Sequence, residues 1–399
     1  MIAAWHVYPL GFVGAPIRGG YGFDPQSRFE HLTRWLGYVV DLGCDALSLG
    51  PVFRSVSHGY DTLDYFSIDP RLGTAADFDQ FLAAAHDHGL KVLLDGVFNH
   101  VASEHPLYRA AQAGDAEARR CFIWKDGYAE AFEGNLDLIK LNHAEPKVAE
   151  MVASVLYHWL DRGVDGFRMD AAYAVGPDFF AGILPGIRES FPQAYFFGEV
   201  IHGDYADFVA RSTLDAVTEY ELWKSCWSAI DAKNFFELSW TLSRMNALVD
   251  SYAPVTFIGN HDTSRIATLV GAERVPLALA VLLSIGGFPQ IYYGDEQGFV
   301  GVKEQRRGGD DAVRPPFPDS VQNLWGFGWW LFDVHKALLA VRRDRPWLAR
   351  AHVTNIELAT HTYHYRVEAE GQYLEVHLDV DQPSVVLTDA NGTVFRYGL

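Results

Sequence analysis

The chain has 399 residues, a length that suits several small domains or one large α/β domain with an appendage. Its 32 basic and 51 acidic residues give a formal net charge of −19. Because like charges repel, this balance excludes a surface built for nucleic acid or for an anionic membrane, so we expect no nucleic-acid partner. A neutral or cationic small molecule is the expected partner.

The N-terminal sequence, the apolar segments and the cysteines bear on the expected location and chemistry of the protein. The N-terminal sequence MIAAWHVYPLG has no basic segment followed by a long apolar one, so it does not resemble a secretion signal. No stretch approaches the roughly 20 apolar residues of a membrane span. Cys44, Cys121 and Cys226 lack the spacing of a disulfide framework or a zinc site. We therefore expect a cytoplasmic protein without a membrane partner, and its oligomeric state stays unknown.

Short β-type segments alternate with helical patterns from the N-terminus to about residue 345, which is typical of parallel α/β architecture. Eight strands are predicted, and this number suggests a closed (β/α)8 barrel. They cover residues 2–8, 46–49, 92–94, 166–169, 195–197, 216–218, 256–258 and 290–293.

The segments between the strands read as outer helices, since their apolar residues recur three and four positions apart. The clearest of them are residues 31–42, 77–88, 147–160 and 277–284. A glycine follows each pattern, where a left-handed helix stop is expected. These glycines are Gly43, Gly89, Gly163 and Gly286.

Two segments depart from this alternation. Residues 101–142 are too long for a simple loop after the third strand and predict a small inserted domain that overhangs the barrel. Residues 349–399 alternate polar and apolar side chains between turn signals, which predicts a small antiparallel β domain. The barrel itself would then comprise residues 1–100 and 143–348.

Four carboxyl side chains close four short apolar runs. Asp95 follows the apolar residues 92–94 and is the first residue of DGVFNH. Asp170 ends GFRMD, Glu199 ends FFGE and Asp262 ends FIGNHD. A buried carboxylate needs a partner, a metal or a shifted proton affinity. In a barrel all four would lie at the carboxyl ends of strands, where barrel active sites are built. Their convergence predicts an active site.

The neighbours of these acids suggest their chemistry. Arg168 lies two residues before Asp170, so in a strand both side chains point to one face, and the guanidinium should hold Asp170 ionised. Glu199 ends a very apolar run, where partial burial favours the protonated acid. One ionised and one protonated carboxyl make a nucleophile and a general acid.

Read together, DGVFNH, GFRMDAA, GEV and FIGNHDTSR resemble the four ordered signature regions of the α-amylase family of glycoside hydrolases. The resemblance extends to HGYDTLDYFSIDPRLGT (residues 58–74) and IYYGDE (residues 291–296), and it covers nearly the whole chain. It implies a retaining hydrolase in which Asp170 is the nucleophile, Glu199 the general acid/base and Asp262 the transition-state stabiliser.

The resemblance also implies roles for the residues around the three acids. Arg168 would position the nucleophile, His100 and His261 would bind hydroxyl groups of the reacting sugar, and Tyr60 would stack on it. Asp95 would order the floor of the site. The chemistry needs no cofactor, while Asn99 matches a calcium-binding asparagine of long starch-cleaving amylases, so a structural calcium ion is left open. Its candidate partners are Glu104, Asp115, Glu117 and Asp126.

The branch of the family is indicated by LIKLN (residues 138–142), which resembles the corresponding stretch of neopullulanases and cyclomaltodextrinases. That branch cleaves small α-1,4-linked or mixed α-1,4/α-1,6 oligosaccharides. Two departures are the absence of that branch's amino-terminal β domain and the sequence GEVIHGD after the acid. A transglycosylase or isomerase acting on small α-glucosides such as trehalose or sucrose is the alternative. A metal-dependent barrel hydrolase and a non-catalytic relative are weaker ones.

Overall fold

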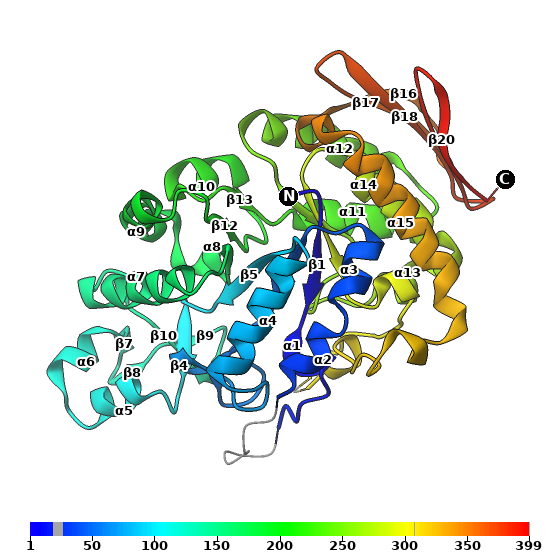
Figure 1. The fold of residues 1–399 in the computed structure, drawn as a ribbon. Coiled ribbons are helices and arrows are strands. Elements are labelled where there is room, and N and C mark those ends of the chain that lie inside the picture. Colours follow the sequence, from blue (N-terminus) through cyan, green and yellow to red (C-terminus); the bar gives the residue numbers. More distant parts are fainter. Residues whose placement is uncertain (19–26, 307, 399) are drawn as a thin grey trace.

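The computed structural model describes residues 1–18, 27–306 and 308–398. Eight parallel strands form the central sheet in the order β13-β12-β11-β5-β2-β1-β15-β14, and a parallel bridge from Thr218 to Val255 joins its two ends. The eight-stranded barrel is therefore confirmed (Figure 1). Its strands are β1 (Ala4–Val7), β2 (Ala46–Leu49), β5 (Lys91–Gly96), β11 (Gly166–Met169), β12 (Tyr195–Gly198), β13 (Ala216–Val217), β14 (Val255–Phe257) and β15 (Phe288–Tyr292).

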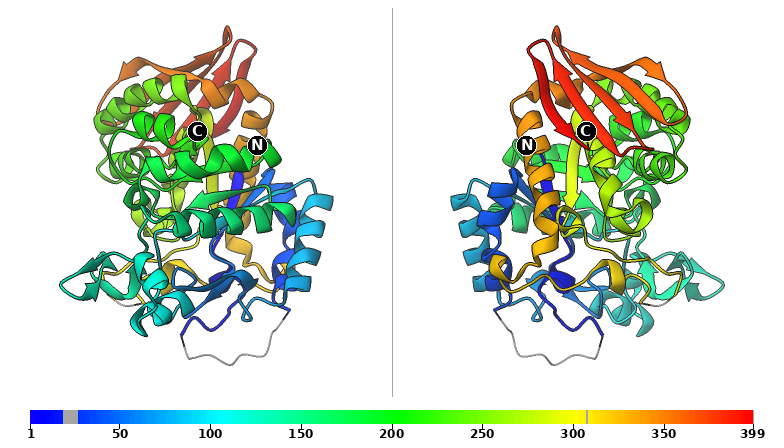
Figure 2. Two further views of the ribbon diagram at one scale, coloured as in Figure 1. Left: turned by 90° about the vertical axis from the view of Figure 1, so that its left-hand side faces the viewer. Right: turned by 90° about the vertical axis from the view of Figure 1, so that its right-hand side faces the viewer.

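Helices surround the barrel and bury their apolar sides against it (Figure 2). The longer ones are α3 (Leu36–Leu42), α4 (Ala75–Asp87), α7 (Pro146–Asp161), α9 (Pro177–Ser190), α10 (Tyr205–Ser212), α11 (Tyr220–Asp231), α12 (Phe236–Ser251), α14 (Val275–Ser284) and α15 (Trp329–Arg343). Short helices are α1 (Pro9–Phe12), α2 (Phe29–Thr33), α8 (Ala172–Val175) and α13 (Ile266–Val270). Among the described residues, none of the helices has the length and apolar character needed to cross a bilayer.

Two details differ from the predicted pattern. The helix expected over residues 31–42 is two helices, α2 and α3, separated at the fully buried Trp35, whose indole nitrogen donates to the carbonyl of Pro318 at 3.0 Å. Gly43, Gly89 and Gly163 have the positive φ of a helix stop, but Gly286 does not; Gly287 does, with φ 127°. Gly286 is required for packing instead, because a Cβ there would lie 2.6 Å from Val249 and 2.9 Å from the Ala351 carbonyl oxygen.

Two small additions border the barrel opening. A hairpin that the sequence did not predict, β3 (Phe53–Ser55) and β4 (Thr62–Ile68), follows β2. The segment inserted after β5 contains β6 (His100–Ala102), α5 (Pro106–Gln112), α6 (Ala116–Arg120), β7 (Trp124–Lys125), β8 (Tyr128–Ala129), β9 (Ala131–Phe132) and β10 (Asn135–Lys140). Figure 1 shows this segment projecting from the barrel.

The C-terminal residues form a five-stranded antiparallel sheet, as predicted. Its strands are β16 (His352–Leu358), β17 (Thr362–Ala369), β18 (Gln372–Asp379), β19 (Ser384–Asp389) and β20 (Gly392–Tyr397). The sheet packs against α12 and α14, where the Tyr365 hydroxyl lies 2.9 Å from Ser284 Oγ. In Figure 1 it lies at the opposite end of the molecule from the inserted segment, so it supports the barrel rather than the active-site opening.

Candidate active site

One guanidinium holds three of the predicted acids together. Arg168 Nη1 lies 2.8 and 2.7 Å from the two Asp95 carboxylate oxygens and 3.0 Å from Asp170 Oδ1, and its Nη2 lies 2.9 Å from Glu199 Oε1. The side chains come from the ends of β5, β11 and β12 and are at most 7% exposed. The structure therefore brings these three acids to one cation, as the position of each acid at a strand end predicts.

The electrostatics of Asp170 differ from expectation. Burial raises the pKa of Asp170 well above its usual range, and although Arg168 opposes this, repulsion from Glu199 and Asp95 adds to it. The contact at 3.0 Å agrees with the expected pairing of Arg168 and Asp170, but the direction of this pKa opposes the expectation that Arg168 holds Asp170 ionised. The physical reason is that a single positive charge is shared by three buried carboxyl groups, so it cannot neutralise each of them.

Glu199 receives two further hydrogen-bond donors that the sequence did not indicate. The Ala171 N–H donates to Oε2 at 3.0 Å, from a residue whose φ of 45° is unusual for a side chain with a Cβ. The Tyr220 hydroxyl donates to Oε1 at 2.9 Å and accepts from Asn260 Nδ2 at 3.0 Å. Glu199 is thus fixed from both sides, which is the pre-organisation that proton transfer to a bound substrate requires.

Asp262 has a cationic environment of its own. Arg314, a buried residue of the loop after β15, places Nη2 2.7 Å from Asp262 Oδ1, and His261 Nε2 lies 2.8 Å from Oδ2. Burial alone would raise the pKa of Asp262, but His261, Arg314 and Lys303 outweigh it and lower that pKa well below its usual range. Asp262 is therefore a permanent carboxylate on the wall of the site. Arg314 was not among the predicted site residues.

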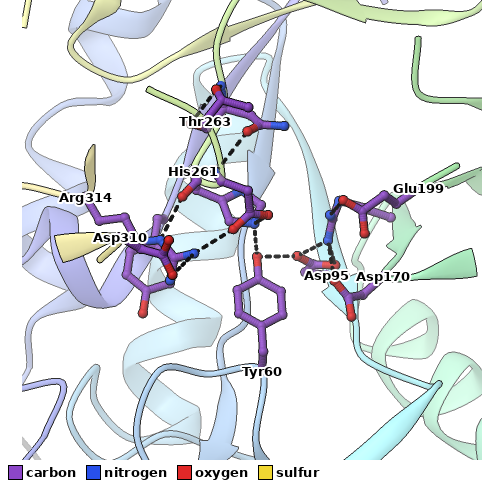
Figure 3. A network of polar contacts seen from close by, with 12 residues as sticks. Tyr60, Asp95, Asp170, Glu199, His261, Thr263, Asp310 and Arg314 are labelled. Carbon is purple, nitrogen blue, oxygen red and sulfur yellow. Dashed lines mark hydrogen bonds and ion pairs between the residues drawn. The ribbon is translucent and has the colours of Figure 1, made fainter. Parts of the chain in front are cut away.

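Tyr60 and His261 link the two groups of acids (Figure 3). The Tyr60 hydroxyl lies 3.1 Å from Asp95 Oδ2 and 2.5 Å from His261 Nε2. Tyr60 has a partly exposed ring that borders the cleft, in the position that a stacking residue needs.

His100 is placed differently from the expected hydroxyl ligand. Its Nε2 lies 2.9 Å from the Tyr60 carbonyl oxygen, its Nδ1 lies 3.1 Å from Asn99 Nδ2, and its ring stacks on Phe132 with centroids 4.8 Å apart. The residue is 1% exposed. Both ring nitrogens are therefore engaged with the protein, and in this structure His100 supports Tyr60.

A cleft of about 790 Å³ opens beside these residues. Tyr60 and Asp262 line it together with the inserted segment (Glu133, Asn135, Asp137 and Leu138) and with the loop after β15 (Asp310, Asp311 and Arg314). The lining is polar and rich in hydrogen-bonding groups. Such a cleft suits a ligand with many hydroxyl groups and is large enough for a small oligosaccharide.

The residues proposed for calcium make other contacts in this structure. Asn99 is fully buried, and its Oδ1 has no hydrogen-bond partner within the described residues. Across residues 1–18, 27–306 and 308–398, no three His, Cys, Asp or Glu side chains are grouped to hold a metal. The expected partners serve other contacts: Glu104 pairs with Arg109, Glu117 with Lys147, and Asp115 caps α6, while Asp126 adopts a positive φ.

We expect removal of metal ions to change little. After dialysis against a chelator, kcat and the melting temperature Tm should equal those of untreated protein, because Arg168 and Arg314 already supply positive charge to the acids of the site. Steady-state rates and thermal unfolding measure both. Loss of activity that added Ca²⁺ or Zn²⁺ restores would contradict this expectation and favour a metal-dependent hydrolase.

Comparison with known proteins agrees with this geometry. A family model described as "Alpha amylase, catalytic domain" matches residues 29–323. A 4-alpha-glucanotransferase of Thermotoga neapolitana is 30% identical, over 89% of this chain and 91% of that protein. A cyclomaltodextrinase of Geobacillus thermopakistaniensis is 30% identical over 84% of this chain, which spans only 58% of that protein.

Solved structures give the same fold. The ligand-free cyclic alpha-maltosyl-(1→6)-maltose hydrolase from Arthrobacter globiformis superimposes with a TM-score of 0.82. The alignment covers 99% of this chain and 97% of that one, at 23% sequence identity.

Proposed function

This chain belongs to the α-amylase family of glycoside hydrolases, and from that premise we propose that it cleaves α-glucosidic bonds, α-1,4 and α-1,6, in short or cyclic gluco-oligosaccharides. The observation that supports this proposal most is the convergence of Asp170 and Glu199 on the two ends of one buried guanidinium. A retaining mechanism needs two carboxyl groups close together, and these contacts hold the two side chains near each other.

In the proposed mechanism Asp170 attacks the anomeric carbon while Glu199 protonates the oxygen of the leaving sugar. The C–O bond to the leaving group breaks, and a covalent glycosyl-enzyme forms on Asp170. Glu199, now a carboxylate, then takes a proton from a water molecule that opens the intermediate. Asp262 binds sugar hydroxyls and favours the oxocarbenium-like ring, for which its ionised state is suited.

Short and cyclic substrates are supported by the relatives. Two of the similar proteins are named cyclomaltodextrinase, and another is named neopullulanase 2, at 27–30% identity. The chain spans 58–64% of these three proteins, so their complete activities are carried over only as a proposal. The polar cleft beside Tyr60 and Asp262 agrees with an oligosaccharide of a few units.

Transfer to a second sugar is the alternative function. The 4-alpha-glucanotransferase of Thermotoga neapolitana aligns over 91% of its length, more than the cyclomaltodextrinases do. Both outcomes use the same glycosyl-enzyme and differ in whether water or a sugar hydroxyl reaches it first. An isomerase of trehalose or sucrose would use the same intermediate.

A product assay tests the proposal. The purified protein is incubated with maltose, maltotriose, cyclodextrin, pullulan, isomaltose, trehalose and sucrose, with Asp170→Asn as the control. We expect free glucose or maltose from at least one α-glucan, and none with the variant. Longer products or exchanged glucosyl units would establish the transferase, and the absence of turnover on every sugar would contradict α-glucosidic chemistry.

A further inference from the structure

His6 is a buried histidine that neither the sequence motifs nor the proposed mechanism uses. It lies in β1, is 3% exposed, and is paired in register with Ser48 on one side and Tyr292 on the other. Its Nδ1 lies 3.1 Å from the Ser48 carbonyl oxygen and its Nε2 lies 2.8 Å from His261 Nδ1. It therefore contacts one of the residues that face the substrate.

The hydrogen on each ring nitrogen follows from these partners. A carbonyl oxygen only accepts, so His6 Nδ1 carries the hydrogen. Burial, with the nearby His261 and Arg168, lowers the pKa of His6 well below its usual value, so the ring is neutral and Nε2 has a free lone pair. His261 Nδ1 must therefore be the donor to His6 Nε2.

The other nitrogen of His261 then has a fixed role. Nε2 lies 2.8 Å from Asp262 Oδ2, which is ionised, and 2.5 Å from the Tyr60 hydroxyl, whose own hydrogen points to Asp95. A bare nitrogen would repel the carboxylate at that distance, so Nε2 also carries a hydrogen. With hydrogens on both nitrogens, the ring of His261 is an imidazolium.

The surroundings are consistent with this charge. Asp262 lies 2.8 Å from His261 Nε2 and supplies negative charge, while Arg314 donates through Nε to the backbone oxygen of His261 at 2.9 Å. Tyr8 stacks above the imidazole with centroids 6.4 Å apart. Arg168, the other nearby cation, is paired with the carboxyl groups of Asp95, Asp170 and Glu199.

We propose that His6 is a positioning residue. It accepts the hydrogen of His261 Nδ1 and so keeps His261 doubly protonated. It also directs His261 Nε2–H toward Asp262, Tyr60 and a sugar hydroxyl bound beside them. This rests on the proposed function, in which Asp262 and His261 hold the reacting sugar. A neutral acceptor at this point orients the ring of His261 without adding negative charge, whereas a carboxylate in the same place would add a negative charge.

The test uses ring-¹⁵N-labelled histidine and four variants: His6→Leu, His6→Gln, His261→Gln and the control His335→Leu. His335 is also fully buried and bonds only a carbonyl, of Leu331, but lies in α15, so its loss reports the general cost of removing a core histidine. His261→Gln assigns the His261 signals by difference. The amide of His6→Gln still offers one donor and one acceptor.

For the wild type we expect both His261 nitrogens to resonate as protonated nitrogens, and one of them to become bare in His6→Leu. kcat/KM should fall about a hundredfold in His6→Leu, mainly through kcat, and recover to within about tenfold in His6→Gln. His335→Leu should lose only its own signals and keep the wild-type His261 signals and kcat/KM.

A bare His261 Nδ1 in the wild-type spectrum would overturn the proposal, as would an unchanged spectrum and rate in His6→Leu. The wild-type spectrum requires no substrate, so it decides the ring protonation even where no sugar is turned over, and even where His6→Leu does not fold. Failure of the proposed function is thereby distinguished from failure of this inference.

Discussion

Asp170→Asn should abolish glycoside turnover and, at neutral pH, make the folded protein more stable. The loss of the nucleophile should lower kcat by about 10⁴-fold or more. The stability gain follows from the raised pKa of Asp170, since burial and the neighbouring carboxyls disfavour its charge in the folded state. We expect a gain of about 1 kcal/mol, the usual size for a stabilising substitution.

The pH dependence of this gain has a definite sign. A carboxyl whose folded-state pKa is raised binds its proton more tightly in the folded protein, so the stability of the wild type falls as pH rises from about 4 through the raised pKa. The asparagine does not titrate. The difference in Tm between variant and wild type should therefore be small near pH 4 and larger at pH 7, and the acidic limb of wild-type kcat/KM should lie above pH 4.

Thermal unfolding at both pH values and steady-state kinetics measure these effects. Asp79→Asn is a matched control, since Asp79 is an exposed carboxylate paired with Arg162. It should change Tm and kcat little. A variant of Asp170 that is less stable than the wild type at pH 7 would contradict the electrostatic account, and one that retains kcat would contradict the assignment of the nucleophile.

Arg168→Met should have the largest effect on folding. Arg168 is 5% exposed and is the cation for Asp95, Asp170 and Glu199, and these three acids together raise its own pKa against the effect of burial. Removing one partner of a buried ion pair costs about 3–5 kcal/mol, because charges are left without a counter-ion. Urea unfolding at pH 7 measures this loss, and we expect no detectable turnover.

Two comparisons separate charge from packing. Arg162→Met removes a partly exposed arginine paired with Asp79 and should cost at most about 1 kcal/mol. Asp95→Asn added to Arg168→Met should recover part of the stability, because it removes one of the buried carboxyl groups left without a counter-ion. If the double variant is no more stable than Arg168→Met, then packing rather than charge determines the loss.

Local sequence patterns were sufficient for the barrel and for the positions of the acids. The strand over residues 166–169 is predicted with the bounds that the structure has, and the helix over residues 147–160 is one residue shorter at each end than α7. Both results follow from the strong periodicity of these segments. Because parallel strands end at the same edge, placing Asp95, Asp170 and Glu199 after their strands was enough to predict that they meet.

Contacts between distant segments could not be predicted in this way. His6 and His261 are 255 positions apart, and Arg314 and Asp262 are 52 positions apart. Tyr220 begins a helix whose pattern indicates only packing, and its hydroxyl contact with Glu199 depends on the closure of the barrel. The shared cation likewise changes the electrostatics of Asp170 in a way that the Arg168–Asp170 spacing alone does not reveal.

The most direct test of the central claim is to trap the covalent intermediate on Asp170. A 5-fluoro-α-glucosyl fluoride transfers its sugar to the nucleophile as fluoride leaves, and the ring fluorine slows the hydrolysis that follows by destabilising the oxocarbenium-like transition state. Intact mass and peptide mass spectrometry should show one fluoroglucosyl group, located on Asp170. A label on another residue, or none in a preparation that turns over α-glucosides, would contradict a retaining mechanism through Asp170.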